Sequence, residues 1–254
     1  MAAGENESES YSAIILVIVL IGVAAYILLY GLQTLIYFDV RHWGSANPWL
    51  YETPRTLAIT AAPAAPTTHL EFYNYECEAP WKGPAKVNES PDYIDARFPS
   101  GPTVRVELPE EQADSLQSFK GETPDQQQHI VNVFGTHPFD SNFDLFAATY
   151  SASPAQVSPF TPRIDAERVN TLLIWKLTLD TELPGGTFEF EAGKLRGLQF
   201  GDPDKSATVV LRAFNEHDRQ FKILLTRTTA GSKLTQGDIN QLIASLKPIP
   251  LPGQ

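Results

Sequence analysis

Residues 187–227 read TFEFEAGKLRGLQFGDPDKSATVVLRAFNEHDRQFKILLTR, with apolar side chains at many alternate positions. Alternation of this kind predicts β-strands that bury one face. The expected strands are 187–191, 195–200, 207–214 and 221–227. The turns Gly201-Asp-Pro-Asp and Asn215-Glu-His-Asp are short and rich in turn-forming residues. Because short turns join antiparallel neighbours, the segment predicts a meander.

A helix is expected immediately after the meander. Residues 234–246 read LTQGDINQLIASL, in which Thr235 and Asp238 have the spacing of a capping box. The apolar residues that share one helical face are Ile239, Leu242, Ile243 and Leu246. Strands followed by a closing helix predict an α+β fold with a mostly antiparallel, sandwich-like sheet and a C-terminal packing helix. A pure β-sandwich is the alternative.

Further elements are expected upstream. Alternating runs predict strands at 69–75, 93–98, 103–108, 129–134 and 171–179. Residues 109–119 begin Pro-Glu-Glu-Gln and predict a short helix that buries Leu116 and Phe119. Prolines interrupt residues 135–168, so we expect an ordered, phenylalanine-rich loop over the sheet edge or against a partner.

The sequence divides into five segments by composition. They are an acidic tail (1–11), a transmembrane helix (12–38), an interfacial and Pro/Ala/Thr-rich linker (39–68), a β-rich extrinsic domain (69–247, divisible into 69–165 and 166–247) and a Pro-rich tail (248–254). Prolines at 248, 250 and 252 are expected to end all regular structure.

The transmembrane helix is predicted from Ala13 to Phe38, which contains no charged residue. At about 1.5 Å of rise per residue, this stretch exceeds the roughly 30 Å of a bilayer's hydrocarbon core. A cleaved signal peptide is the alternative, and it requires a basic region before a short apolar stretch. The preceding residues contain three glutamates and no Lys or Arg. We therefore expect a retained single-pass anchor.

Candidate membrane or partner contacts lie along this helix and just beyond it. Aromatic residues near both ends suit the headgroup level of a bilayer. Gln33 is expected to snorkel toward water or to bond a neighbouring helix, and Gly22 permits close helix approach. The full set is Tyr11, Gly22, Gln33, Tyr37, Phe38, Trp43, Trp49 and Tyr51.

The basic residues nearest the helix favour one orientation. Arg41 and Arg55 follow it, whereas no basic residue precedes it. Because Lys and Arg close to a span tend to stay cytoplasmic, we expect the N-terminus outside and the extrinsic domain in the cytoplasm.

Charge and cysteine content exclude several classes of function. The formal net charge of the 254 residues is −11, which disfavours binding to nucleic acid. Cys77 is the only cysteine, so no intrachain disulfide or Cys-based zinc site is possible. The five histidines never stand four residues apart, and each is expected to be a surface or hydrogen-bonded residue.

No catalytic motif is present. Asp140, Asn142 and Asp144 resemble the start of a calcium loop, but the glycine and the bidentate glutamate of that loop are missing. There is no nucleophile elbow, phosphate loop or dinucleotide motif, and Cys77 lies between glutamates, which raise a thiol's pKa. We expect no enzyme activity, no cofactor and no metal. A cleft holding His129 or His137 beside two carboxylates would revive the enzyme hypothesis.

The leading hypothesis is a single-pass accessory subunit that stabilises a larger membrane complex. Its expected partners are other membrane subunits and the lipid bilayer, and the residues do not distinguish respiratory, photosynthetic and secretion complexes. The alternative is an anchored binding or sensor module, which requires a concave pocket with a few convergent polar groups.

Overall fold

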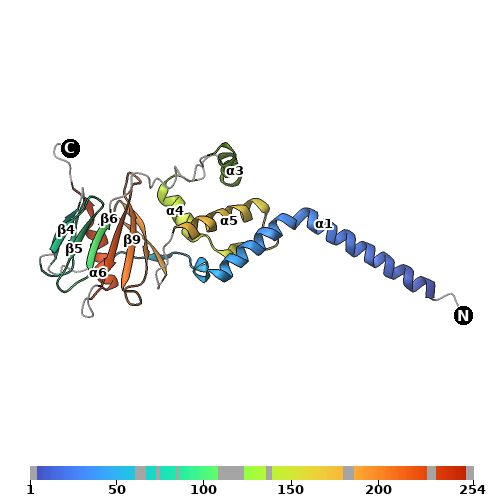
Figure 1. Cartoon of the computed structure of the whole chain (residues 1–254), viewed down its shortest axis with the longest axis horizontal. Coiled ribbons are helices and arrows are strands. Elements are labelled where there is room, and N and C mark those ends of the chain that lie inside the picture. The colour runs from blue at the N-terminus through green and yellow to red at the C-terminus, as the bar shows by residue number, and fades with distance from the viewer. Residues whose placement is uncertain are drawn as a thin grey trace.

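The chain forms three parts that follow one another along the long axis in Figure 1: the helix α1 (Glu5–Ala46), a layer of shorter helices and a β-rich domain. The structure is a computed structural model, and side chains of residues 5–15 and 28–29 are not described. It describes residues 5–60, 67–72, 75–83, 86–107, 123–135, 139–179, 186–227 and 233–249.

The β-rich domain is built on a sheet of eight strands in the order β1-β7-β8-β9-β10-β6-β5-β4. These strands are β1 (Arg55–Leu57), β4 (Lys86–Glu89), β5 (Tyr93–Arg97), β6 (Thr103–Glu107), β7 (Thr187–Ala192), β8 (Leu195–Phe200), β9 (Thr208–Phe214) and β10 (Gln220–Thr226). Strands β7 to β10 are successive antiparallel neighbours, which confirms the predicted meander. Only β1, paired with β7, is parallel among the described pairs of this sheet.

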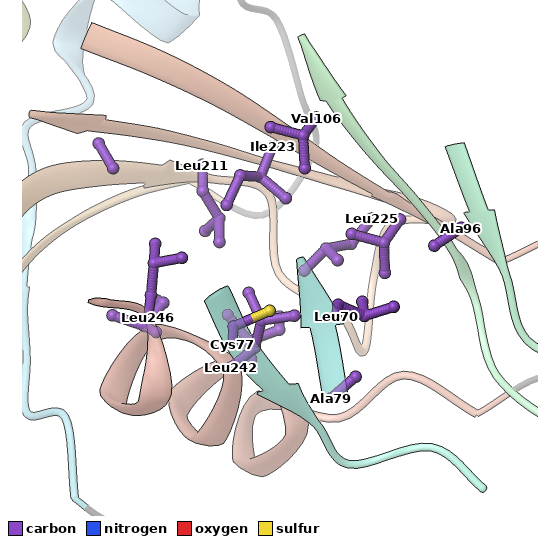
Figure 2. Close-up of a cluster of buried hydrophobic side chains, with 14 of the residues drawn as sticks. Leu70, Cys77, Ala79, Ala96, Val106, Leu211, Ile223, Leu225, Leu242 and Leu246 are labelled. Atoms are coloured by element: carbon purple, nitrogen blue, oxygen red, sulfur yellow. The ribbon is translucent and has the colours of Figure 1, made fainter. Parts of the chain in front are cut away.

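A second layer covers one face of this sheet. It contains the three-stranded sheet β11-β3-β2 and the helix α6. Its elements are β2 (Thr68–Phe72), β3 (Tyr75–Ala79), α6 (Gln236–Ser245) and β11 (Lys247–Pro248). Figure 2 shows the core between the layers, where Leu211 and Ile223 of the large sheet lie above Cys77, Leu242 and Leu246. The predicted α+β class, mostly antiparallel sheet and C-terminal packing helix are confirmed.

Helix α6 begins at the predicted capping box. The Thr235 hydroxyl accepts a hydrogen bond from the Asp238 amide at 3.2 Å, and the Asp238 carboxylate accepts one from the Thr235 amide at 2.9 Å. Ile239, Leu242 and Ile243 are buried on one face of the helix, as their spacing predicts.

Helix α4 (Asn142–Ser151) covers part of the other face of the large sheet. Its Phe146 ring lies 5.4 Å from the Phe214 ring of β9, and its Tyr150 ring lies 4.7 Å from the Phe200 ring of β8. These aromatic contacts join the helical layer to the β-rich domain.

Two predictions between 135 and 179 are wrong. The expected loop contains α4 and the short helix η2 (Pro154–Gln156), and the strand expected at 171–179 belongs to helix α5 (Arg163–Thr178). The prolines do not interrupt these helices, because Pro154 occupies the first turn of η2 and Pro162 immediately precedes α5. Near the end of α5 nearly every residue is apolar, and such a run does not distinguish a helix from a strand by its periodicity.

The strand predicted at 129–134 is also wrong, because these residues end helix α3 (Pro124–Phe134). Its start is fixed by a capping box between Thr123 and Gln126 with a proline in the first turn. Val133 is buried and Val131 is 41 % exposed, so the alternation of valines reflects two sides of a helix.

The structure also differs from the predicted elements at three other places. The strand predicted at 69–75 is a hairpin of β2 and β3, and the expected linker contains the short helix η1 (Pro48–Tyr51) and strand β1. Pro248 belongs to β11, which pairs with β3. The helix predicted at 109–119 lies outside the described residues.

Candidate functional site

The first half of α1 exposes apolar side chains on every side. The six consecutive residues Leu16–Ile21 are each 53–63 % exposed, and six residues cover the whole circumference of a helix. In Figure 1 this segment extends away from the other elements, and the described part of the chain does not cover it. A helix that is apolar all round is typical of a buried or membrane environment.

Helix α1 is bent between its two halves. Segments Leu16–Ile27 and Tyr30–Ala46 meet at 67°. Among the described residues, no single helix is both long and apolar enough to cross a membrane, and this bent pair is one candidate by length and composition. The predicted single transmembrane helix over residues 12–38 is therefore not confirmed.

The second half of α1 is part of the helical layer. Gln33, Ile36 and Val40 are buried at helical spacing on one face, and this half packs against α5 and η1. The opposite face exposes Leu35 by 62 % and Phe38 by 61 %. The helix is thus amphipathic after the bend, with its inner face already occupied by the chain's own residues.

This packing changes the surroundings of several predicted contact residues. Gln33 is only 7 % exposed, so its expected snorkelling toward water is wrong. Tyr37, Trp43 and Trp49 are half-buried and pack on the same helical cluster, which also contains Leu50. These rings lie against the chain's own residues.

The remaining predicted contacts are more open. Phe38 faces outward, and Tyr51, 38 % exposed, accepts a hydrogen bond from Arg41 at 3.3 Å. A Cβ atom added to Gly22 would meet nothing within 4 Å. The side chain of Tyr11 lies outside the described residues.

Three aromatic side chains that the sequence analysis did not select gather beside the bend. The Tyr26 and Tyr30 rings are stacked at 5.5 Å, and Phe160 approaches Tyr30 edge-on at 6.3 Å. Phe160 precedes α5 and is 71 % exposed. The group forms an exposed aromatic collar, consisting of Tyr26, Tyr30 and Phe160, where the apolar half of α1 meets the helical layer.

A buried lysine holds the helical layer together. Lys176 on α5 is 2 % exposed, and its ammonium group donates to backbone carbonyl oxygens at 2.7–3.3 Å. Its three N–H groups are shared among four acceptors, the carbonyl oxygens of Leu50, Glu52, Tyr150 and Ala152. Burial lowers the pKa of Lys176 to about 8, against the weaker effect of the Glu52 charge. The apolar run around this lysine, read as a strand, gave no sign of this role.

The described candidates for catalysis lie on separate elements of the fold. Burial, followed by the charge of Glu78, raises the pKa of the Cys77 thiol to about 12, so the thiolate needed for nucleophilic attack is scarce. His129 is exposed on α3, and His137 lies outside the described residues. Asp144 lies in the first turn of α4, where its amide bonds the Ser141 hydroxyl instead of belonging to a calcium loop.

A pocket of about 540 Å³ opens where the turns after β7 and β9 approach β3 and the end of α6. Its wall includes Tyr75, Leu195 and Leu246. The Asn215 side-chain amide, also in the wall, donates a hydrogen bond to the Tyr75 hydroxyl at 2.5 Å. The wall is mixed, because it also carries Glu191, Lys194, Glu216, His217 and Lys247. The volume suits a small ligand, and the polar groups could orient one.

Comparisons with known proteins give no relative. No protein-family model, no curated protein and no solved structure matches this chain.

Proposed function

We propose that this chain is a single-pass, membrane-anchored accessory subunit that stabilises a larger membrane protein complex. The observation that carries the proposal is the continuity of α1. Its first half exposes apolar side chains on every side, and its second half is packed into a folded helical layer. A helix of this kind joins an apolar environment to a soluble domain.

The bend suggests where the span ends. From Ser12 to Tyr30 a helix rises about 28 Å at about 1.5 Å per residue, close to the thickness of the hydrocarbon core. The aromatic collar then lies at the membrane surface, where tyrosine rings are favoured. We propose that it replaces Trp43 and Trp49 as the interfacial belt, since both pack inside the helical layer.

A second exposed strip supports the subunit role. Leu32, Leu35 and Phe38 lie on the outer face of the second half of α1, beyond the proposed span. Single exposed apolar residues are common, but three on one helical face beside a membrane suit contact with a neighbouring subunit. The occupants that we propose for the two surfaces are therefore lipid for Leu16–Ile27 and protein for the strip.

The decisive experiment is purification from the native membrane in mild detergent, followed by mass analysis of the particle. We expect a stoichiometric complex with other membrane subunits. Migration as a lone monomer would contradict the accessory role, and recovery in the soluble fraction would contradict the anchor.

We keep the proposed orientation, with the N-terminus outside and the β-rich domain in the cytoplasm, because Arg41 follows the proposed span closely and basic residues near a span tend to stay cytoplasmic. Proteolysis of sealed, right-side-out vesicles tests it. Protection of the β-rich domain until lysis is expected, and digestion before lysis would reverse the orientation.

The pocket beside Tyr75 supports a second candidate, an anchored small-ligand binding module. Replacement of Ala192 in its wall by Trp places a large ring at the pocket and is expected to obstruct it. Native mass spectrometry of the purified chain would then lose any small-molecule adduct that the wild type carries. An adduct that persists in Ala192→Trp, or a wild type without one, counts against this candidate.

A further inference from the structure

We propose that the small sheet holds a zinc ion between His69, Glu71 and Glu76. The backbone brings these residues together. Strands β2 and β3 are antiparallel, with His69 opposite Glu78 and Glu71 opposite Glu76. Alternate residues share a face of a sheet, so these four polar side chains lie on one side. The other side carries the buried Leu70 and Cys77, which fix the hairpin on the core.

The distances suit three ligands of one ion. The Nε2 atom of His69 lies 3.1 Å from a carboxylate oxygen of Glu71 and 3.6 Å from one of Glu76. Ligand atoms about 2.0–2.1 Å from a tetrahedral zinc ion lie about 3.4 Å from one another. One atom from each of the three side chains falls within 4.8 Å of the others.

Glu78 completes the arrangement from behind the imidazole ring. Its carboxylate oxygen lies 3.0 Å from the Nδ1 atom of His69. A proton on Nδ1 donated to Glu78 leaves the lone pair of Nε2 directed between Glu71 and Glu76. Carboxylates commonly orient metal-binding histidines in this way and increase the basicity of the ring. Glu78 is therefore a positioning residue.

The charges favour a cation. Glu71 and Glu76 are directly opposite on neighbouring strands, and like charges in this position destabilise a sheet. Lys247 contacts Glu76 at 3.0 Å, but a single ammonium group leaves the three carboxylates in excess. One imidazole with two carboxylates suits zinc better than calcium or magnesium, which prefer more oxygen ligands. The solvent exposure of His69 and Glu71, 47 % and 67 % for their side chains, leaves room for water as a fourth ligand.

The test uses the full chain in detergent, loaded with zinc, desalted and assayed for bound metal by elemental mass spectrometry. We expect one zinc ion per wild-type chain, a loss of at least about tenfold in affinity for His69→Ala and Glu76→Gln, and a loss of about 10–100-fold for Glu78→Gln. The matched control is His217→Ala, which removes another exposed histidine beside a glutamate, 3.9 Å away. It should bind like the wild type.

Cobalt provides a second readout, because tetrahedral coordination by these side chains gives a visible absorption band that non-specific surface binding does not. Circular dichroism without metal verifies that each variant is folded. Substoichiometric zinc in the wild type, wild-type affinity in His69→Ala, or equal losses in His69→Ala and His217→Ala would each overturn the proposal.

Discussion

The ammonium nitrogen of Lys176 lies 2.7 Å from the backbone carbonyl oxygen of Glu52, so α5 is bonded directly to the segment that leaves α1. The same group also bonds the carbonyl oxygens of Tyr150 and Ala152 at the end of α4. One buried cation thus satisfies the ends of several helical elements.

Replacement of Lys176 by Met is expected to destabilise the chain by about 2–4 kcal/mol, although methionine has a similar shape, because buried carbonyl oxygens lose their donor. Denaturant unfolding of the full chain in detergent measures the change. The control is Lys222→Met, which removes an ion pair with Glu107 at a partly exposed site and is expected to cost at most about 1 kcal/mol. Equal losses in both variants would contradict the role of Lys176.

Gly197 on β8 is expected to tolerate no side chain. A Cβ atom there would collide with the backbone oxygen of Arg212 and with the Phe190 ring. We expect Gly197→Ala to lower the free energy of unfolding by about 1–3 kcal/mol, the usual cost of overpacking. Gly237→Ala in the first turn of α6 is the control, since its nearest neighbour is 3.6 Å away and alanine favours a helix. Its stability should equal or exceed that of the wild type.

The ion pair between Asp95 and Arg105 predicts acid sensitivity. Asp95 is 2 % exposed and accepts two hydrogen bonds from Arg105, at 2.7 and 3.0 Å, which hold its pKa below the usual range. The unfolded chain therefore binds a proton more readily than the folded chain. The stability from this pair is present above the unfolded pKa of about 3.9 and is lost as the pH falls through the lower folded value.

Unfolding of Asp95→Asn between pH 6 and pH 2.5 tests this linkage. We expect lower stability at pH 6, by about 1–3 kcal/mol, and a shallower further loss below about pH 4 than in the wild type. Val104→Ala on the neighbouring strand changes no titrating group and should keep the wild-type slope. An unchanged slope in Asp95→Asn would contradict the prediction.

The proposed anchor predicts that replacing two similarly exposed valines by arginine has different effects on membrane association. Val19 on α1 is 53 % exposed and Val87 on β4 is 49 % exposed. Arginine near the centre of a span costs about 2.5–3.5 kcal/mol on insertion scales, so Val19→Arg is expected to reduce the carbonate-resistant membrane fraction several-fold. Val87→Arg is expected to leave it unchanged. Equal membrane fractions for both variants would exclude lipid as the environment of Val19.

The proposed subunit contact is tested by Leu35→Asp combined with Phe38→Asp. Both side chains face outward, so folding should survive while co-purification of partner subunits is reduced at least about tenfold. Asp39→Asn, an exposed change immediately after Phe38, serves as the control. Retention of all partner subunits by the double variant would contradict the proposed subunit contact at this strip.

The meander was largely predictable, because short turns bound each strand and β10 alternates between buried and half-buried residues. Strands β8 and β9 are buried almost throughout, because the small sheet and α4 cover opposite faces of the large sheet. The capping box at Thr235 and Asp238 likewise fixed the start of α6. Helix α5 was missed because its last turns are crowded with apolar residues, among which a 3.6-residue period and a strand look alike. Helix α4 is hard to predict because prolines stand close to it on both sides, although Pro138 and Pro154 lie outside its bounds.

The candidate site was predicted only in part. The uncharged run identified α1 as the apolar element, but a bend near Ile27 has no proline to signal it. Lys176 and Phe160 become informative only through residues far away in the chain. The His69 cluster is partly visible in the sequence as His69-x-Glu71 and Glu76-x-Glu78. Only the register of β2 and β3 shows that these two pairs face each other.

Strand β1 gives the chain a mechanical property. Three residues separate the end of η1 at Tyr51 from β1, and β1 is hydrogen-bonded to the edge of the meander at β7. This short connection allows little independent movement of the helical layer and the large sheet. Tilting of the proposed anchor is therefore expected to rotate the β-rich domain with it.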